Sequence, residues 1–499
     1  MKRLMFMTLT VAFAAGLSFA QEAVTPQVPD KDWTKAMWLP RFDAKRALAA
    51  QGGYEVVFLG DSITHNWETH GKEVWAKNYA EGPYKALNCG ISADRTEHLL
   101  WRIDHGQLDG LSPKALVLMI GTNNTGHRDM VHEPPLDTIL GIQSILGRLN
   151  EKFPEAKVIL HPIFPCGDVT NEARRVRNDV VNAAIKKLAD GQKILWCDFN
   201  SRLLTADGVL EKTMAKDLLH PGPAGYEIWA EELKPFLDYA LGRTEKAPRS
   251  KAKPAPTALP QDVARTMRPE VKMHWLADKN PKTQPRLRDK RAEETANADR
   301  YYDAIWLGDS ITHFWEFKDR CEVFKEKFGQ YKILNLGFGG DHTENLLWNV
   351  TYGGFLDGVQ TRLITLMIGT NNTWNDSAED IAAGIKACVE AVRAKQPQAK
   401  LLLFTLLPRE VAHKRGERNY RRTNPNVDEI MPKQTKVNEL IRPLADGKDI
   451  FLVDLTEKFT DAEGLPDVTL LPDGTHPGPE GYRVWADAVL PLYRQILGR

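Results

Sequence analysis

The sequence predicts two tandem α/β/α sandwiches, each built on a central parallel sheet. Three observations lead to this fold class. The chain has 499 residues, too many for a single hydrophobic core. Four sequence blocks occur twice in the same order. Within each copy, short β-branched runs alternate with longer amphipathic ones, a pattern typical of parallel sheets covered by helices on both faces.

The four repeated blocks relate the two halves of the chain. They are EVVFLGDSITHNWE with DAIWLGDSITHFWE, ALNCGISADRTEHLLW with ILNLGFGGDHTENLLW, LVLMIGTNNT with ITLMIGTNNT, and DLLHPGPAGYEIWA with DGTHPGPEGYRVWA. Ser62 and Ser310 lie 248 residues apart, and His220 and His476 lie 256 apart, so only small insertions separate the copies. We therefore expect a domain duplication, with domains at residues 21–242 and 273–499.

The elements of the first copy follow from this alternation. The expected strands are 56–59, 86–88, 116–120, 158–161 and 194–198. Between several of them, residues 138–152 and 176–189 follow the helical period. A last helix begins at Pro223, which suits a first-turn proline, and presents Leu233 and Leu237 on one face.

The amino terminus predicts a secretory signal over residues 1–20. Lys2 and Arg3 precede an apolar run to about Leu17, and Ala20 completes a small-x-small cleavage motif. A membrane anchor is disfavoured because the run is shorter than about 20 residues. No Cys follows the cleavage motif, which argues against a lipoprotein. We expect an exported protein, secreted or periplasmic, with no membrane span after cleavage.

The segment between the copies, residues 243–272, predicts a semi-rigid linker because it carries five prolines among Lys, Arg, Ala and Ser. Lys+Arg and Asp+Glu number 66 each, so no net charge attracts nucleic acid or anionic lipid. The five cysteines show no CxxC or zinc-type spacing. We expect most of them in the core, with Cys166 and Cys197 as a candidate disulfide pair.

A serine follows the first predicted strand of each copy. Ser62 and Ser310 begin a helix, where main-chain N–H groups stabilise negative charge. A serine in such a position becomes a nucleophile only if a base removes its proton. A general base is therefore required in each copy.

Histidine recurs at two pairs of equivalent positions. These are His65 with His313, and His220 with His476. The second pair ends a D-x-x-H motif, in which Asp217 or Asp473 can orient one ring nitrogen while the other takes the serine proton. The first pair has no nearby carboxylate to orient it, so we expect those rings to line the pocket or pack against the helix.

Donors for an oxyanion are also available. Asn123 and Asn371 end the third strand, and the turn after the second strand offers main-chain N–H groups. Alone, GDS can be a helix cap, GTNN a turn and HPGP a helix start. Together at strand ends, in one order and twice, they favour a serine hydrolase. No HExxH spacing supports a metal hydrolase, the G-x-S-x-G elbow is absent, and no cofactor is expected.

The four blocks resemble those of the GDSL or SGNH hydrolases over most of each half. The resemblance is closest to the platelet-activating-factor acetylhydrolase-like and carbohydrate O-acetylesterase branch, through NLGFGGDHTENLLW, MIGTNN and D-x-x-HP. It implies a flavodoxin-like α/β/α sandwich and a serine esterase. The implied triads are Ser62, His220, Asp217 and Ser310, His476, Asp473, and the implied oxyanion asparagines are Asn123 and Asn371.

The family's oxyanion glycine precedes the Asp of the second block, and here the copies differ. This residue is Gly340 in the second copy but Ala93 in the first. If the turn needs a positive φ, Ala93 is strained, or it relaxes and turns its N–H away from the oxyanion. With an ordinary φ, Ala93 is harmless. We expect the first site to be the slower one.

The resemblance and the signal together imply an exported esterase that removes short acyl groups, acetyl above all, from carbohydrates. A lysophospholipase or arylesterase with the same triad is one alternative, and a glycan-binding protein with an inactive copy is another. From Pro408 to Asn438 the second copy spans 30 positions, against 17 from Pro165 to Asn182 in the first. The longer loop is basic, so it is either a solvated surface or selects acidic glycan esters. Its cations are Arg409, Lys414, Arg415, Arg418, Arg421 and Arg422.

Overall fold

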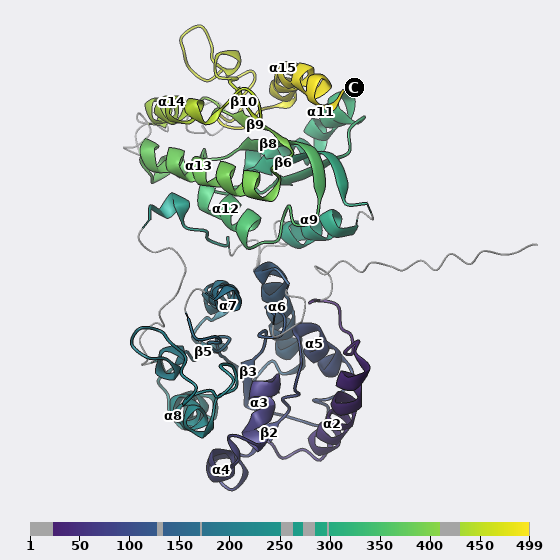
Figure 1. Ribbon diagram of the computed structural model, residues 1–499, viewed down its shortest axis with the longest axis vertical. Coiled ribbons are helices and arrows are strands. Elements are labelled where there is room, and N and C mark those ends of the chain that lie inside the picture. The colour runs from purple at the N-terminus through teal and green to yellow at the C-terminus, as the bar shows by residue number, and fades with distance from the viewer. Residues whose placement is uncertain are drawn as a thin grey trace, which may run out of the picture.

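The computed structural model describes residues 23–126, 133–169, 172–250, 263–272, 285–296, 299–409 and 430–498. The predicted signal, residues 1–20, lies outside these ranges, as does most of the basic loop of the second copy, residues 410–429. Figure 1 shows the two copies as successive α/β units, the first coloured purple to teal and the second green to yellow.

The first copy holds one five-stranded sheet. Its strands are β1 (Val56–Gly60), β2 (Ala86–Asn88), β3 (Ala115–Met119), β4 (Lys157–Leu160) and β5 (Ile194–Trp196). Its helices are α2 (Asp32–Ala50), α3 (Ser62–His65), α4 (Lys72–Trp75), α5 (Thr96–Asp104), α6 (Pro135–Lys152), α7 (Ala173–Ile185) and α8 (Pro223–Ala240). All strand pairs are parallel, in the order β2-β1-β3-β4-β5. The five predicted strands and three predicted helices are confirmed, with shifts of up to four residues at their ends.

The second copy repeats this topology. Its strands are β6 (Tyr301–Gly308), β7 (Ile333–Gly337), β8 (Gln360–Met367), β9 (Lys400–Phe404) and β10 (Ile450–Val453). Its helices are α9 (Pro285–Ala296), α10 (Ser310–His313), α11 (Lys318–Phe328), α12 (Thr343–Thr351), α13 (Ala378–Lys395), α14 (Ile430–Ile441) and α15 (Pro479–Leu497). The sheet order, β7-β6-β8-β9-β10, is that of the first copy.

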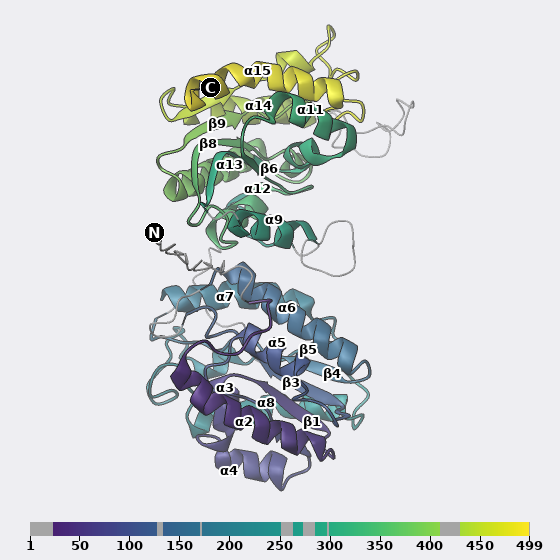
Figure 2. The same ribbon diagram turned by 90° about the vertical axis from the view of Figure 1, so that its right-hand side faces the viewer.

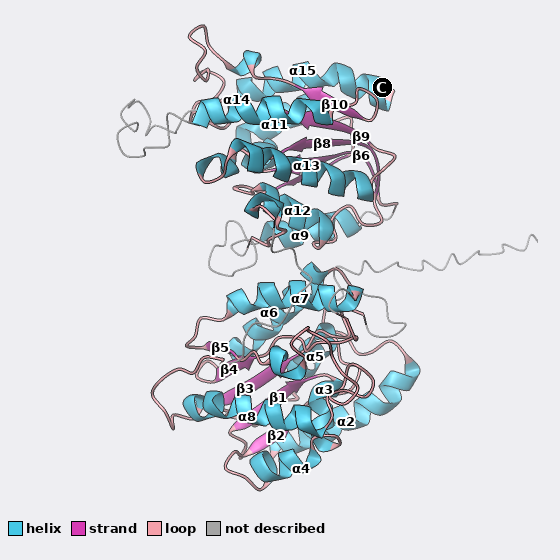
Figure 3. Ribbon diagram, turned by 60° about the vertical axis from the view of Figure 1, so that its left-hand side comes forward, coloured by secondary structure: helices cyan, strands magenta, loops and turns pink. Residues whose placement is uncertain are grey.

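Helices cover both faces of each sheet, as Figures 2 and 3 show. Alternate residues of a strand point to opposite faces. In β1, Val57 and Leu59 belong to the core under α5, α6 and α7, whereas Val56 and Phe58 belong to the core under α8. Strand β1 is therefore apolar along its whole length, and the predicted α/β/α sandwich is confirmed.

The strand order determines where a site can form. Chain segments leaving the carboxyl ends of neighbouring parallel strands meet at one edge, and a crevice opens where the strand order reverses. Here β1 lies between β2 and β3 in the first copy, and β6 lies between β7 and β8 in the second. The serine, the second-block turn and GTNN all follow these strands.

The predicted disulfide between Cys166 and Cys197 is wrong. Both thiols are free and buried. Asn178 donates to Cys166 Sγ at 3.4 Å, while Cys197 Sγ donates to the carbonyl of Glu232 at 3.8 Å, so each sulfur has a separate partner. Among the described residues, no helix combines the length and apolarity needed to cross a membrane.

Candidate active site

The first serine lies directly at the carboxyl end of β1. Asp61 caps α3 by accepting a 2.9 Å hydrogen bond from the N–H of Ile63, so Ser62 becomes the first helical residue. Gly60 permits this tight turn, because a Cβ there would lie 2.2 Å from the carbonyl oxygen of Met119. The second copy repeats the arrangement around Ser310, with Asp309 as the cap.

The structure brings together the three residues predicted for the first triad. Ser62 Oγ lies 2.8 Å from His220 Nε2, and His220 Nδ1 lies 2.7 Å from Asp217 Oδ2. The other oxygen of Asp217 accepts the main-chain N–H of His220 at 2.8 Å. Burial raises the pKa of Asp217, but these hydrogen bonds outweigh it and bring the pKa to about 2. Asp217 is therefore ionised and orients the ring.

The second triad has the same geometry. Ser310 Oγ lies 2.7 Å from His476 Nε2, and His476 Nδ1 lies 2.7 Å from Asp473 Oδ2. Burial opposes ionisation of Asp473, yet its hydrogen bonds to His476 lower the pKa to about 2. Both copies thus hold a hydrogen-bonded Ser, His and Asp in one row, the arrangement of a serine nucleophile with its base.

The histidines three residues after each serine, His65 and His313, are not part of the hydrogen-bonded triads. His65 Nδ1 is 2.8 Å from Ser92 Oγ, and burial together with Arg41 lowers the pKa of His65 to about 4. Burial also lowers the pKa of His313 to about 3. Both rings are therefore neutral at physiological pH, in keeping with a packing role.

The predicted oxyanion donors lie in two turns that contact each other. Asn123 Nδ2 donates to the carbonyl of Asp94 at 2.7 Å, and Asn371 Nδ2 donates to the carbonyl of Asp341 at 2.9 Å. Each amide therefore has a second N–H for another acceptor. The residue before each Asp is Ala93 or Gly340.

Both of these residues have left-handed backbone, with φ of 66° at Ala93 and 74° at Gly340. The turn thus requires a positive φ, and the first copy meets this requirement with a Cβ-bearing residue. The D-x-x-H turn shows the same contrast, with φ of 58° at Leu218 and 74° at Gly474. Left-handed backbone disfavours residues with a Cβ, so the first site is strained at two turns where the second has glycine.

Two further pairs of residues support the sites, although the sequence interpretation gave them no role. Asn88 Nδ2 donates to the carbonyl of Thr64, and Asn335 does the same for Thr312. Tyr226 and Tyr482 each donate a 2.6 Å hydrogen bond to the carbonyl of the residue after the serine. These contacts tie the nucleophile helix to the second strand and to the last helix. Recurrence in both copies was the signal that could have revealed them.

The charge around the two serines differs. Burial raises the pKa of Asp61 to about 7. Burial also raises the pKa of Asp309, but only to about 6, because Arg409 and Lys272 oppose it together with His476. Arg409 donates to the carbonyl of Thr370 at 3.0 Å and lies 4.8 Å from the centre of the Trp374 ring. Two cations, Arg409 and Lys272, therefore act on the carboxylate beside Ser310.

Known proteins resemble single copies of this chain. It is 32% identical to platelet-activating factor acetylhydrolase IB subunit alpha1 of Homo sapiens over 205 residues, 40% of this chain and 83% of that protein. It is 30% identical to subunit alpha2 of Rattus norvegicus over 201 residues, 40% of this chain and 80% of that protein. A solved carbohydrate acetylesterase family member from Sinorhizobium meliloti matches with a TM-score of 0.31 and 18% identity, covering 40% of this chain and 100% of that one.

A family model matches each copy separately. The GDSL-like Lipase/Acylhydrolase model matches residues 58–228 and 306–484, which together make up more than half of the chain. Each matched region runs from the strand before the serine to the helix after the histidine. The chain therefore belongs to the GDSL-like lipase/acylhydrolase family and is a carboxylic ester hydrolase.

Proposed function

We propose that the chain is an exported serine esterase that removes short acyl groups, acetyl above all, from carbohydrates. The observation that carries the proposal is the hydrogen-bonded row of Ser, His and Asp, present in both copies beside an Asn and a left-handed turn. The proposed mechanism needs only side chains and backbone of this chain.

In the first step, Ser62 Oγ attacks the ester carbonyl carbon while His220 Nε2 accepts the serine proton. The resulting oxyanion accepts hydrogen bonds from the remaining N–H of Asn123 and from the main-chain N–H groups of Ser62 and Ala93. When the intermediate collapses, the bond to the alcohol oxygen breaks and the His220 ring donates its proton to that oxygen. An acyl-serine remains, and the alcohol leaves.

In the second step, water attacks the acyl carbon and gives a proton to His220. The same donors hold the second oxyanion. Collapse returns the proton to Ser62 Oγ and releases the carboxylic acid. Throughout, ionised Asp217 orients the ring and stabilises the imidazolium form. Ser310, His476, Asp473, Asn371 and Gly340 take the same roles in the second copy.

Different observations support the proposed acyl part and the proposed alcohol part of the substrate. The curated relatives are acetylhydrolases by name, which supports acetyl as the acyl group. The predicted signal over residues 1–20 and the resemblance to carbohydrate O-acetylesterases support an extracellular glycan as the alcohol. If the signal is cleaved after Ala20, we expect the exported protein to begin at Gln21.

The test is a double variant, Ser62→Ala with Ser310→Ala. We expect esterase activity to disappear, because loss of a serine nucleophile costs on the order of 10⁶ in kcat. Acetate release would be measured on a panel of acetylated glycans, beside p-nitrophenyl esters of increasing chain length. The melting temperature, compared with wild type, checks that the variant folds. A folded double variant with full activity would exclude the mechanism, and a preference for long acyl chains would favour the lipid-ester alternative.

A further inference from the structure

The two copies hold their oxyanion turns with equivalent carboxylates. In the first copy, Asn124 follows the oxyanion residue Asn123, and its Nδ2 donates to Glu97 at 3.1 Å and to Glu133 at 3.0 Å. Arg95, in the second-block turn, binds both carboxylates, with its Nε 2.9 Å from Glu97. The cation that neutralises this pair thus belongs to the domain itself.

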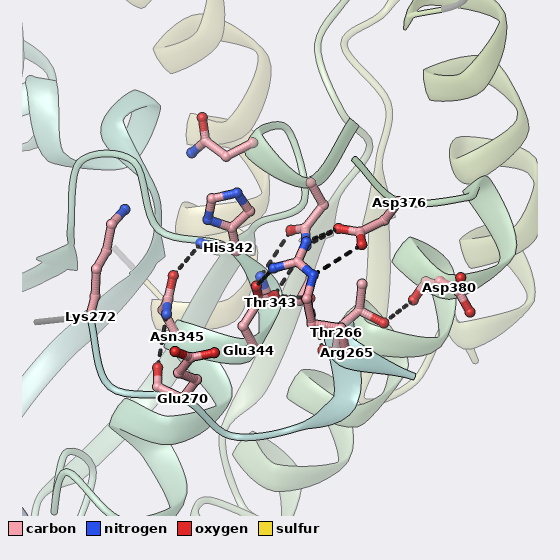
Figure 4. A network of polar contacts seen from close by, with 12 residues as sticks. Arg265, Thr266, Glu270, Lys272, His342, Thr343, Glu344, Asn345, Asp376 and Asp380 are labelled. Carbon is pink, nitrogen blue, oxygen red and sulfur yellow. Dashed lines mark hydrogen bonds and ion pairs between the residues drawn. The ribbon is translucent and has the colours of Figure 1, made fainter. Parts of the chain in front are cut away.

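In the second copy the corresponding cation comes from outside the repeated blocks. Asn372 Nδ2 donates to Glu344 at 3.1 Å and to Asp376 at 3.0 Å, as Asn124 does in the first copy. The position of Arg95 is occupied by His342, however. The guanidinium that binds both carboxylates belongs to Arg265, from the predicted linker, as Figure 4 shows.

A second cation has been exchanged in the same way. Asp94, whose carbonyl holds Asn123, forms a buried ion pair with Arg102 of α5. The equivalent Asp341 meets Asn349 on α12 at 3.3 Å, and its cation is Lys272 of the linker, 3.7 Å away.

Lys272 also lies directly against the oxyanion turn. Its Nζ donates to the carbonyl of Gly339 at 3.4 Å, and a Cβ on Gly340 would lie 2.8 Å from that nitrogen. The ammonium group therefore packs on the residue whose main-chain N–H would face the oxyanion. A glycine at this position leaves the space that Lys272 occupies.

The end of the linker contacts the second copy as residues 23–27, which precede α2, contact the first copy. Thr343 Oγ1 donates to the carbonyl of Thr266, as Thr96 Oγ1 does to that of Ala23. The N–H of Glu270 donates to the carbonyl of Glu344, as that of Gln27 does to Glu97. By this register Lys272 lies at the position of the uncharged Pro29 in the first copy.

We propose that Arg265 and Lys272 are positioning residues of the second active site, so that the linker completes its oxyanion hole. This rests on the proposed esterase function. Glu344 and Asp341 are 2% and 1% exposed, and a buried carboxylate without a cation is strongly unfavourable. Arg265 acts on Asn371 through the carboxylates that hold the adjacent Asn372. Lys272 acts on Gly340 and on the Asp341 carbonyl that holds Asn371.

The test uses the full chain with one site inactivated. In a Ser62→Ala background, which leaves only the second site, we expect Arg265→Ala or Lys272→Met to lower kcat by about 10- to 100-fold with a much smaller change in KM. Displacing an oxyanion donor affects the transition state more than substrate binding. In a Ser310→Ala background, the same changes should leave the first site unaffected. Arg268→Ala is the matched control, because Arg268 is a linker cation whose Nε donates to the carbonyl of Val263, and among the described residues no ion pair joins it to the carboxylates of the second site.

A rescue variant separates positioning from folding. His342→Arg, added to Arg265→Ala, places a guanidinium where the first copy has Arg95, and we expect it to restore most of kcat. Lys272→Arg should likewise keep most of the activity. Unchanged kcat in Arg265→Ala and Lys272→Met would overturn the inference, as would a loss that follows the melting temperature and is not rescued. Activity that survives Ser62→Ala and disappears in the double serine variant establishes the esterase function separately from this result.

Discussion

At the level of single residues, the aspartate before each serine is buried, which destabilises its ionised form. Asp61 is fully buried, and among the described residues its Oδ2 has no hydrogen-bond partner. Burial raises its pKa to about 7, although the hydrogen bond from Ile63 opposes this. The folded chain therefore keeps a proton on Asp61 at pH values where the unfolded chain, with a pKa of 3.8, has lost it. Stability from this group is present below about pH 4 and is lost as the pH rises to 7.

We expect Asp61→Asn to remove this dependence, because Asn can still accept the capping hydrogen bond but does not ionise. Relative to wild type, the variant should gain on the order of 4 kcal/mol in unfolding free energy between pH 4 and pH 8. Urea unfolding of both proteins across this range measures the gain. Asp309→Asn is the matched comparison and should show a smaller gain over a window ending near pH 6. Parallel pH profiles for wild type and Asp61→Asn would contradict the expectation.

At the level of elements, the loop after β9 distinguishes the second site. Residues 410–429 lie outside the described residues, including Lys414, Arg415, Arg418, Arg421 and Arg422, so their predicted role in selecting acidic glycans stays a prediction. Arg409, at the start of the loop, is described. The GTNN turn and Trp374 hold it, and it acts electrostatically on Asp309 and Asp473. The corresponding position of the first copy is Cys166.

We expect Arg409→Met, in the Ser62→Ala background, to raise KM for acetyl esters carrying a carboxylate by about tenfold. This is the effect of losing one charge-assisted hydrogen bond of roughly 1.5 kcal/mol. KM for a neutral ester of similar size should change little. Steady-state kinetics on such a pair provides the measurement, and deletion of residues 410–429 extends it to the loop. Equal changes for both esters would mean that the loop is only a solvated surface.

At the level of the whole molecule, the duplication is what made the site predictable. One copy alone would have left GDS, GTNN and D-x-x-H as ordinary caps and turns, whereas two copies separated the recurring residues from the rest. The sequence interpretation did not reveal Arg265 and Lys272. They lie in a segment without periodicity, and they replace Arg95 and Arg102 from outside the aligned blocks. The disulfide prediction was wrong because it rested on the expected oxidising compartment and on the number of cysteines. Neither shows whether two thiols point toward each other.

The same duplication provides the comparison for the last prediction, that the two sites are unequal and Ser310 dominates. The oxyanion turn and the D-x-x-H turn have positive φ in both copies. In the first copy the residues with positive φ are Ala93 and Leu218, whereas the second copy has glycine at both positions. A residue with a Cβ in left-handed backbone costs roughly 1–2 kcal/mol. Populating a relaxed turn instead removes a donor, which costs about 10²–10³ in rate. Ser310→Ala should therefore remove more kcat/KM on a small acetyl ester than Ser62→Ala.

Glycine substitutions then show whether these turns are the cause. In the Ser310→Ala chain, where only the first site works, Ala93→Gly should raise kcat because glycine holds the left-handed turn without strain. Leu218→Gly should act in the same direction through the turn that carries His220. The matched change in the other copy, Gly340→Ala in the Ser62→Ala chain, should lower kcat, since its Cβ would also meet Lys272 Nζ at 2.8 Å. Equal losses from the two serine variants, or no response to Ala93→Gly, would mean that the first turn keeps its donor in place despite the strain.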